Sequence, residues 1–438
     1  MSKDQVIQNK FAEKGEVLPS DSEFKRKIDE LCKGIHPYEH IESMDYPRMV
    51  GTEGAQRGAE YIENKFREYG YEPKIEEFYF PQSSATSRSI LPIGITLICV
   101  FSLINISFIK GILGTIFALL ILSIPIIVLL LILKLEVVFK KILAWNWKKI
   151  QKSFQQMEIG ISNKSVKKGK NIYVEYTPPE FDEHLYLTAH YDSTTLRINL
   201  FTIKICLFFG IIAAILYFSG YFLHYFYQIT RGLDFFGANS PIFVIIFFIF
   251  IVPLDIILFG RAFRTNTSHG ANDDLTGVAL ILDLAKITKL VKPKIKITFI
   301  AFSAEEAGLF GSAYHYHKNK EYFQSANVHV VSIDLVGEIP PLSLVERIKP
   351  VFGIPLSKEF NNEMVKLAHK LGIEVKLRKI LYPGSDFAHW FLDGYQTNWI
   401  MTPSNYIHSS KDVAQNVNQS LLNSCLKLFV AYLIQKDK

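Results

Sequence analysis

Apolar and polar residues follow two different patterns along this chain of 438 residues. Over most of its length, short runs rich in Val and Ile alternate with longer segments whose apolar residues recur at helical spacing. This alternation predicts an α/β fold with a mixed, largely parallel central sheet that is flanked by helices. Strands are expected at "EPKIEEFYF", "NIYVEY", "HLYLTAH", "KIKITFIAF" and "VHVVSID", and helices at Thr52–Tyr71, at Leu275–Leu290, from Leu309 onward, at Lys358–Leu371 and at Gln415–Ile434.

Two apolar blocks, 90–133 and 201–260, interrupt this pattern. The first contains a single charged residue, Lys110, and each block is long enough for two passes of the roughly 20 residues that a membrane-spanning helix needs. We therefore expect two inserted transmembrane hairpins. Their four spans are predicted at Ile90–Ile109, Gly111–Leu133, Ile205–Tyr227 and Pro241–Gly260.

The hairpins would divide the chain into a polar domain, the two apolar insertions and a basic helix. Lys residues are mixed with apolar residues and with Trp145 and Trp147 in this helix, which favours a position in the lipid headgroup layer; packing on the polar domain is the alternative. The polar domain would comprise 1–89, 153–200 and 261–438, the hairpins 90–133 and 201–260, and the basic helix 134–152.

Charged residues indicate the side of the membrane and the class of partner. Most of the Lys and Arg residues that flank the predicted spans lie on the side of the polar segments, and positive charge marks the cytoplasmic side of a membrane. No short apolar core of a signal peptide follows Met1. We therefore expect an integral membrane protein with the lipid bilayer as a partner and the polar domain in the cytoplasm. The net charge of +6 is diffuse and no nucleic-acid-binding motif is present, which argues against nucleic acid. The oligomeric state stays open.

Polar side chains stand where the expected strands end. "LYLTAHYDS" ends with His190 and Asp192, and "VVSIDLVG" ends with Asp334. "ITFIAFSAEEAGLFGS" ends with Glu305 and Glu306. The carboxyl ends of strands form the ligand crevice of open α/β sheets, so we expect these residues to converge.

Two further stretches supply candidate metal ligands. Asp273 and Asp274 are adjacent in "SHGANDDLTGVA", where two carboxylates would repel each other unless a cation lay between or beside them. His408 lies in "NYIHSSKD". Imidazoles and carboxylates together are suitable ligands for zinc or a similar divalent ion. In contrast, His36 and His40 in "HPYEH", and His315 and His317 in "YHYH", are more simply explained by packing.

Six motifs resemble, in order and in residue types, the co-catalytic zinc exopeptidase family. These motifs are "AHYDS", "GANDDLTGVA", "FSAEEAGLFGS", "SIDLVG", "PGSDF" and "IHSSKD". The family includes bacterial leucyl aminopeptidase and aminopeptidase Y, with glutaminyl cyclase and glutamate carboxypeptidase as relatives. The resemblance covers nearly all of the polar segments and implies a zinc exopeptidase-like, phosphorylase/hydrolase-like fold, here in a membrane-anchored member.

The resemblance also implies a role for each site residue. Asp273 would bridge two Zn²⁺ ions, His190 and Asp334 would complete one site, and Glu306 and His408 the other. Glu305 would be the general base, Asp192 would orient His190, and Tyr382 would donate to a developing oxyanion. The peptide bond between Asp273 and Asp274 would be cis. The implied activity is that of an aminopeptidase that hydrolyses peptides with an activated water.

The sequence departs from the family at two points, and two other functions compete. A predicted hairpin separates His190 from Asp273 where relatives have a short loop, and Phe387 replaces a histidine that relatives often have, with His389 two residues later. A glutaminyl-cyclase-like acyltransferase and a catalytically inactive receptor or scaffold are the alternatives. The presence of all the implied ligands favours hydrolysis.

Overall fold

The computed structural model describes residues 21–81, 166–196, 219, 230, 264–348, 353–380 and 384–437. The chain forms two compact units. The first comprises Met1–Pro81, Leu143–Thr194 and Asn266–Lys438, and the second comprises Gln82–Ile142 and Thr195–Thr265. In the described part of the second unit, the short strands β4 (Thr195–Leu196) and β5 (Arg264–Thr265) pair in antiparallel orientation.

Within the described residues, a sheet of nine strands forms the centre of the first unit. The strand order is β1-β2-β6-β3-β7-β11-β8-β10, and β9 pairs with β8. Four neighbours at the centre, β6, β3, β7 and β11, are parallel, whereas β1, β2 and the β11–β8 pair are antiparallel. The strands are β1 (Lys74–Pro81), β2 (Val166–Tyr176), β3 (His184–His190), β6 (Lys296–Phe302), β7 (Val328–Ile333), β8 (Leu342–Ile348), β9 (Ile354–Pro355), β10 (Val375–Ile380) and β11 (Gln396–Met401).

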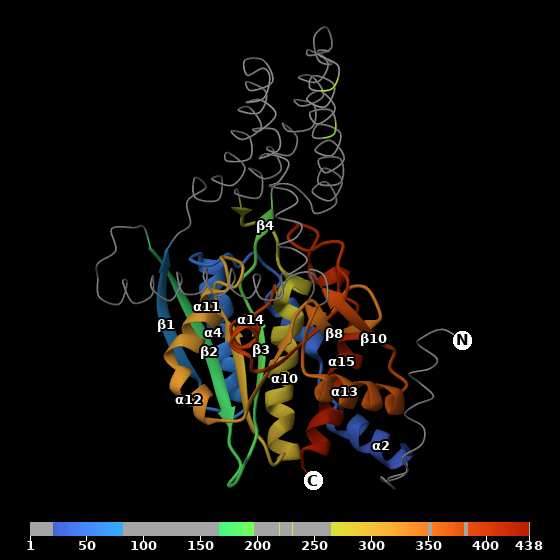
Figure 1. The fold of residues 1–438 in the computed structure, drawn as a ribbon. Helices are drawn as coiled ribbons and strands as arrows, with labels where there is room; N and C mark the ends of the chain where they lie inside the picture. Colours follow the sequence, from blue (N-terminus) through green and yellow to red (C-terminus); the bar gives the residue numbers. More distant parts are fainter. Residues whose placement is uncertain are drawn as a thin grey trace. The chain divides into compact units, whose positions relative to one another are not determined.

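One layer of helices packs on the face of the sheet to which Leu185, Leu187 and Ala189 of β3 point. Helix α10 is the central helix of this layer and lies beside β3 (Figure 1). Almost every residue of α10 is buried, because it contacts the sheet on one side and its neighbouring helices on the other. The layer consists of α2 (Asp21–Leu31), α3 (Pro37–Ser43), α4 (Glu53–Glu68), α10 (Thr276–Val291), α13 (Lys358–Leu371) and α15 (Gln419–Gln435).

The other face carries a second, aromatic layer. Tyr186 of β3 contacts Phe323 and Trp390, and Phe302 of β6 also contacts Trp390. The alternation of side chains along β3 thus places Leu185, Leu187 and Ala189 on one face and Tyr186 on the other. The helices of this layer are α11 (Phe310–Lys318), α12 (Lys320–Ser325) and α14 (Ala388–Asp393).

The five helices expected in the polar segments are present, and capping residues account for the start of three of them. Helix α4 begins at Glu53 because Thr52 is its N-cap and accepts a hydrogen bond from the N–H of Ala55. Ser357 and Asn418 cap α13 and α15 in the same way, so α15 begins at Gln419 rather than at Gln415. Gly372 ends α13 in the left-handed conformation.

The prediction of four membrane spans has to be corrected. None of the helices within the described residues is long and apolar enough to cross a membrane. Apart from residue 219, the four predicted spans and the basic helix at 134–152 lie outside the described residues. The prediction rested on the apolar composition of stretches of about 20 residues, the length that a membrane-spanning helix needs. The two inserted hairpins, the integral membrane localisation and the bilayer as a partner are therefore not supported.

One histidine of each pair set aside in the sequence is packed in the core, whereas His36 is exposed and His317 is partly buried. His40 is buried between Tyr61, Tyr69 and Asp283, with His40 Nδ1 2.8 Å from Tyr61 Oη. His315 is buried against Glu76, with 2.8 Å between His315 Nδ1 and Glu76 Oε2. Both imidazoles are held by neighbouring polar groups inside the core.

Candidate metal centre

The candidate ligands lie at one edge of the sheet, where the central parallel strands end. His190 is the last residue of β3, and Asp334 directly follows β7. Glu306 lies in the turn after β6, and His408 lies in the loop after β11. Asp273 does not follow a strand: it lies in a turn at Ala271–Leu275 that leads into α10.

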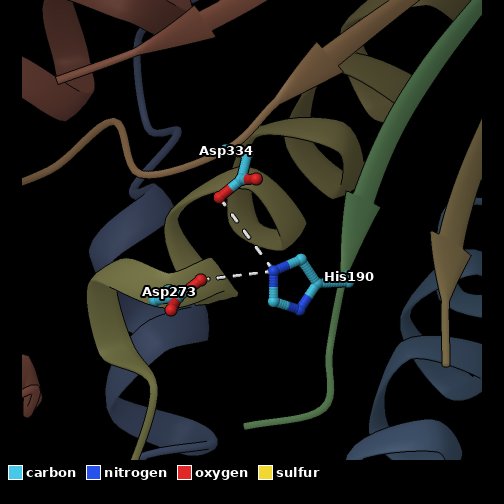
Figure 2. Close-up of side chains that lie close together, drawn as sticks. All are labelled: His190, Asp273 and Asp334. Carbon is cyan, nitrogen blue, oxygen red and sulfur yellow. Dashed lines mark ion pairs between the residues drawn. The ribbon is translucent and has the colours of Figure 1, made fainter. Parts of the chain in front are cut away.

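The first group comprises His190, Asp273 and Asp334. Figure 2 shows the Asp273 and Asp334 side chains pointing toward the same nitrogen of His190, Nε2. His190 Nε2 lies 3.3 Å from Asp273 Oδ1 and 4.0 Å from Asp334 Oδ1. One possible ligand atom of each residue lies within 4.8 Å of the others, a spacing at which a single ion can contact all three.

The second group comprises Asp273, Glu306 and His408. His408 Nε2 lies 3.2 Å from Asp273 Oδ2 and 3.1 Å from Glu306 Oε2. The possible ligand atoms again lie within 4.8 Å of one another. Asp273 therefore belongs to both groups, with Oδ1 facing His190 and Oδ2 facing His408. This is the placement that a carboxylate shared by two cations requires.

Buried oxygen atoms at the centre indicate that positive charge belongs there. Asp273 Oδ2 and Asp334 Oδ1 are buried, and neither accepts a hydrogen bond from any residue that the structure describes. A buried carboxylate oxygen that accepts no hydrogen bond is costly unless a cation contacts it. The donor set of imidazole and carboxylate suits zinc, so the residues present fit such an ion.

Burial and neighbouring charges also shift the pKa values of Asp334 and His190. Burial raises the pKa of Asp334 to about 7 against the opposing effect of His190, and Asp273 adds to the rise. Burial would lower the pKa of His190, but Glu305, Asp273 and Asp334 overcome this effect and raise it well above its ordinary value. The cluster thus favours either bound protons or a bound cation.

The turn that carries Asp273 is fixed from both sides. The peptide bond between Asp273 and Asp274 is cis, as the resemblance implied. Asp274 Oδ1 accepts the N–H of Gly277 at 2.9 Å, and Asp274 Oδ2 accepts the N–H of His190 at 3.2 Å. Asp274 thereby caps the start of α10 and ties it to the end of β3. The two adjacent carboxylates therefore differ in role: Asp274 accepts backbone N–H groups, whereas Asp273 faces His190 and His408.

Asp192 supports the neighbouring turn more closely than it supports the ring of His190. Its carboxylate accepts the N–H of Glu305 at 3.1 Å and the N–H of Glu306 at 3.2 Å. His190 Nδ1 lies 3.1 Å from the backbone oxygen of Asp192 but 3.9 Å from its carboxylate. The contact that orients the imidazole is therefore made by the main chain of Asp192.

Glu305 lies beside the first group without belonging to either one. Its Oε2 is 3.8 Å from His190 Nε2, and its side chain is 12% exposed, more than those of Asp273, Glu306 and Asp334. Burial, together with nearby carboxylates, raises the pKa of Glu305 well above its ordinary value despite His190. A carboxyl group with a raised pKa next to a metal centre can accept and return a proton near neutral pH.

Tyr382 lies outside the described residues. Phe387, at the position where relatives often have histidine, is fully buried and packs against Phe391 and Trp399. His389 is also buried, with its Nε2 3.2 Å from the backbone oxygen of Leu309. Neither residue belongs to the ligand groups.

Two carboxylates that sequence analysis did not assign also lie at the site. Asp412 accepts the N–H of Asn272 at 2.7 Å and the N–H of Asp273 at 3.2 Å. Glu338 accepts the N–H of Asn405 at 2.7 Å and binds Ser404, which holds the loop before His408. Both contacts join backbone segments that are distant in sequence, so residue type alone could not reveal them. For Asp412, the short spacing after His408 was the available signal.

Replacing Asp412 with Asn is expected to weaken divalent-cation binding by about 10-fold to 100-fold. The amide offers one acceptor oxygen in place of two, so one N–H of the Asp273 turn loses its partner. Competition with a chromophoric chelator measures the affinity. Asp29→Asn, at an exposed carboxylate paired with Lys427, is the control and should leave it unchanged. Equal affinities in the two variants would contradict the role given to Asp412.

Part of the chain is similar in sequence to known peptidases. Residues 255–433 match the model of peptidase family M28. Aminopeptidase YwaD of Bacillus subtilis is 38% identical over 71 residues, which is 16% of this chain and 15% of that protein. A probable zinc metalloprotease of Pyricularia oryzae is 39% identical over 71 residues, 16% of this chain and 13% of that protein. The chain thus spans less than a fifth of the length of these curated relatives.

Solved structures show the same fold over a longer stretch. The aminopeptidase from Aneurinibacillus sp. strain AM-1 aligns with a TM-score of 0.52 at 11% identity, covering 93% of this chain and 95% of that one. The zinc aminopeptidase BSAP from Bacillus subtilis aligns with a TM-score of 0.51 at 14% identity, covering 91% and 94%. At such low identity the likeness concerns the fold alone.

Proposed function

We propose, from the match of residues 255–433 to the model of peptidase family M28, that this chain is a zinc-dependent metallopeptidase. We further propose that it acts as an aminopeptidase on peptide substrates and holds two Zn²⁺ ions. The observation that carries this proposal is the position of Asp273, whose two oxygens face His190 and His408 on opposite sides. A purely structural aspartate would not need an imidazole at each oxygen.

The ligand sets follow from the two groups. His190, Asp273 and Asp334 would hold one ion, and Asp273, Glu306 and His408 would hold the other. When bound, the ions supply Lewis acidity, which polarises a substrate carbonyl and makes a water molecule more acidic. The ligands are buried, apart from the partly exposed His408, and this burial strengthens electrostatic interactions within the site.

Glu305 would transfer the proton of the reaction. Its carboxylate lies beside the first ligand group, and its raised pKa lets it accept a proton from the attacking water. It would then return that proton to the amine that leaves when the peptide bond breaks. The N–H of Glu305 is fixed on Asp192, so the turn keeps this carboxylate directed toward the reacting groups.

Hydrolysis of a substrate panel by the full chain tests this function. Aminoacyl-anilides with a free amino group should be cleaved, and their N-acetylated counterparts should not. A chelator should abolish the cleavage, and added Zn²⁺ should restore it. Cyclisation of an N-terminal glutaminyl peptide in place of cleavage would indicate the acyltransferase alternative. Zinc binding without turnover of any substrate would indicate the inactive scaffold.

Removal of the metal is expected to lower thermal stability, and more at neutral pH than at acidic pH. Burial raises the pKa of Asp334 in the folded chain to about 7. Without a cation, the stability that this raised pKa provides is present below about pH 4 and is lost as the pH rises toward about 7. A cation binds the deprotonated ligand, so its own stabilising effect grows over the same range.

Melting temperatures with zinc and with chelator, measured at about pH 5 and about pH 7.5, test this expectation. With free zinc at about a hundred times its dissociation constant, the difference at neutral pH should be roughly 5–10 °C. It should shrink at the lower pH. A difference that is absent, or that grows on acidification, would contradict the assignment of these carboxylates as ligands.

A further inference from the structure

Arg48 is a fully buried cation in the segment between α3 and α4. Its side chain has 0% of its surface exposed, and none of the ion pairs found within the described residues includes it. Burial lowers the pKa of its guanidinium to about 10, which still leaves it charged at neutral pH. Because burying a guanidinium is unfavourable, a compensating set of contacts has to hold it.

Those contacts are four hydrogen bonds, all to backbone carbonyl oxygens. Nη1 donates to Met44 at 2.6 Å and to Tyr46 at 2.8 Å, which are near Arg48 in sequence. The other two reach distant segments: Nε donates to Tyr191 at 2.8 Å, and Nη2 donates to Gly270 at 3.1 Å. Four of the five guanidinium N–H groups are therefore used on main-chain oxygens.

The two distant acceptors belong to the segments that carry metal ligands. Tyr191 lies between His190 and Asp192, and Gly270 lies three residues before Asp273. Gly270 has a φ of 59°, and a Cβ at this position would come within 2.5 Å of the Asp273 oxygen and 3.2 Å of Arg48 Nη2. Glycine at this position thus allows the guanidinium and the turn to approach each other.

The main chain of Arg48 makes a second connection between the same segments. Its N–H donates to Ser193 Oγ at 2.9 Å, and the N–H of Ser193 donates back to the Arg48 oxygen at 3.3 Å. Ser193 Oγ in turn donates to the Ser268 oxygen at 2.9 Å. Arg48 and Ser193 together therefore fix the end of β3 against the turn before α10.

We propose that Arg48 is a positioning residue for the metal centre: its guanidinium sets the spacing between the segments of His190 and Asp273 and thereby tunes zinc affinity. This inference rests on the proposed function. The planar guanidinium directs its N–H groups along fixed and different directions, which suits carbonyls from three segments. The point-like ammonium of lysine keeps the charge but cannot reproduce that arrangement.

Arg48→Lys separates geometry from charge, and Arg347→Lys is the matched control. Arg347 also donates to a backbone carbonyl, that of Gly353 at 2.8 Å, but neither Arg347 nor Gly353 adjoins a candidate ligand in the chain. Chelator competition should show zinc affinity lowered by about 10-fold to 100-fold in Arg48→Lys and unchanged in Arg347→Lys. The visible spectrum of the cobalt-substituted protein, which reports ligand geometry, should change only in Arg48→Lys.

Ser193→Ala provides a second, milder test if Arg48→Lys fails to fold. It removes the side-chain connection while keeping the guanidinium, so zinc affinity should fall in the same direction by a smaller factor. Lower melting temperature with unchanged zinc affinity and cobalt spectrum in these variants would show that Arg48 is merely structural and would overturn the inference. If the unaltered chain binds no zinc, the proposed function itself fails, and the inference fails with it.

Discussion

Glu305→Gln is expected to abolish peptide hydrolysis while leaving zinc content nearly unchanged. The amide keeps the size of the side chain and the backbone N–H that binds Asp192, so the turn should retain its structure. It cannot accept a proton, and loss of general acid–base catalysis lowers rates by about 10²-fold to 10⁴-fold. Since Glu305 belongs to neither ligand group, both zinc sites should remain.

The adjacent residue provides the matched control. Glu306→Gln changes the same side chain one position later, where Oε2 lies 3.1 Å from His408 Nε2. This variant should lose zinc from the site shared with His408, so that its metal content as well as its activity falls. Metal analysis after gel filtration and turnover of a free aminoacyl-anilide distinguish the two. Substantial activity in Glu305→Gln would remove Glu305 as the base.

Asp273→Ala is expected to have the largest effect on metal binding. Because Asp273 faces both His190 and His408, its loss removes one ligand from each group at once. Zinc content should fall by about two equivalents, and activity should fall with it. Outer partners of metal ligands already change affinity by about 10-fold to 100-fold, so loss of a shared ligand should exceed that range.

Asp334→Ala is the comparison variant for Asp273→Ala. It belongs to the first group alone, so one zinc ion should remain with Glu306 and His408. Isothermal titration of each metal-free variant with zinc gives the number of sites. If Asp273→Ala retains two sites, or if the two variants lose the same single ion, Asp273 does not join the two groups.

The strand ends explain why much of the ligand set could be anticipated from sequence. His190 and Asp334 directly end or follow strands that are parallel neighbours, so the topology brings them together once the sheet forms. The helix from Thr276 to Val291 also followed from its apolar pattern and from the polar turn before it. These predictions rested on the local composition of each segment and on the direction of the strands.

The supporting contacts could not be anticipated in the same way. The carboxylate of Asp192 accepts N–H groups from the Glu305–Glu306 turn, more than 100 positions later in the chain. Arg48 likewise reaches Gly270 across 222 positions. Each contact joins a side chain to a backbone group, which carries no signature of residue type. Only the three-dimensional arrangement identifies such pairs.

The corrected membrane prediction has a different origin. Hydropathy reports the composition of a segment, and the prediction took each apolar stretch of about 20 residues as a membrane-spanning helix. The helices of the described residues include none of that kind. Every residue of the two ligand groups lies in the first compact unit.

X-ray diffraction at the zinc absorption edge, from crystals of the zinc-loaded full chain, would measure the metal positions directly. We expect two anomalous peaks on opposite sides of the Asp273 carboxylate, each about 2.0–2.2 Å from one of its oxygens. One should also contact His190 and Asp334, and the other Glu306 and His408. A single peak, or two peaks of which neither is within bonding distance of Asp273, would contradict the shared-carboxylate centre.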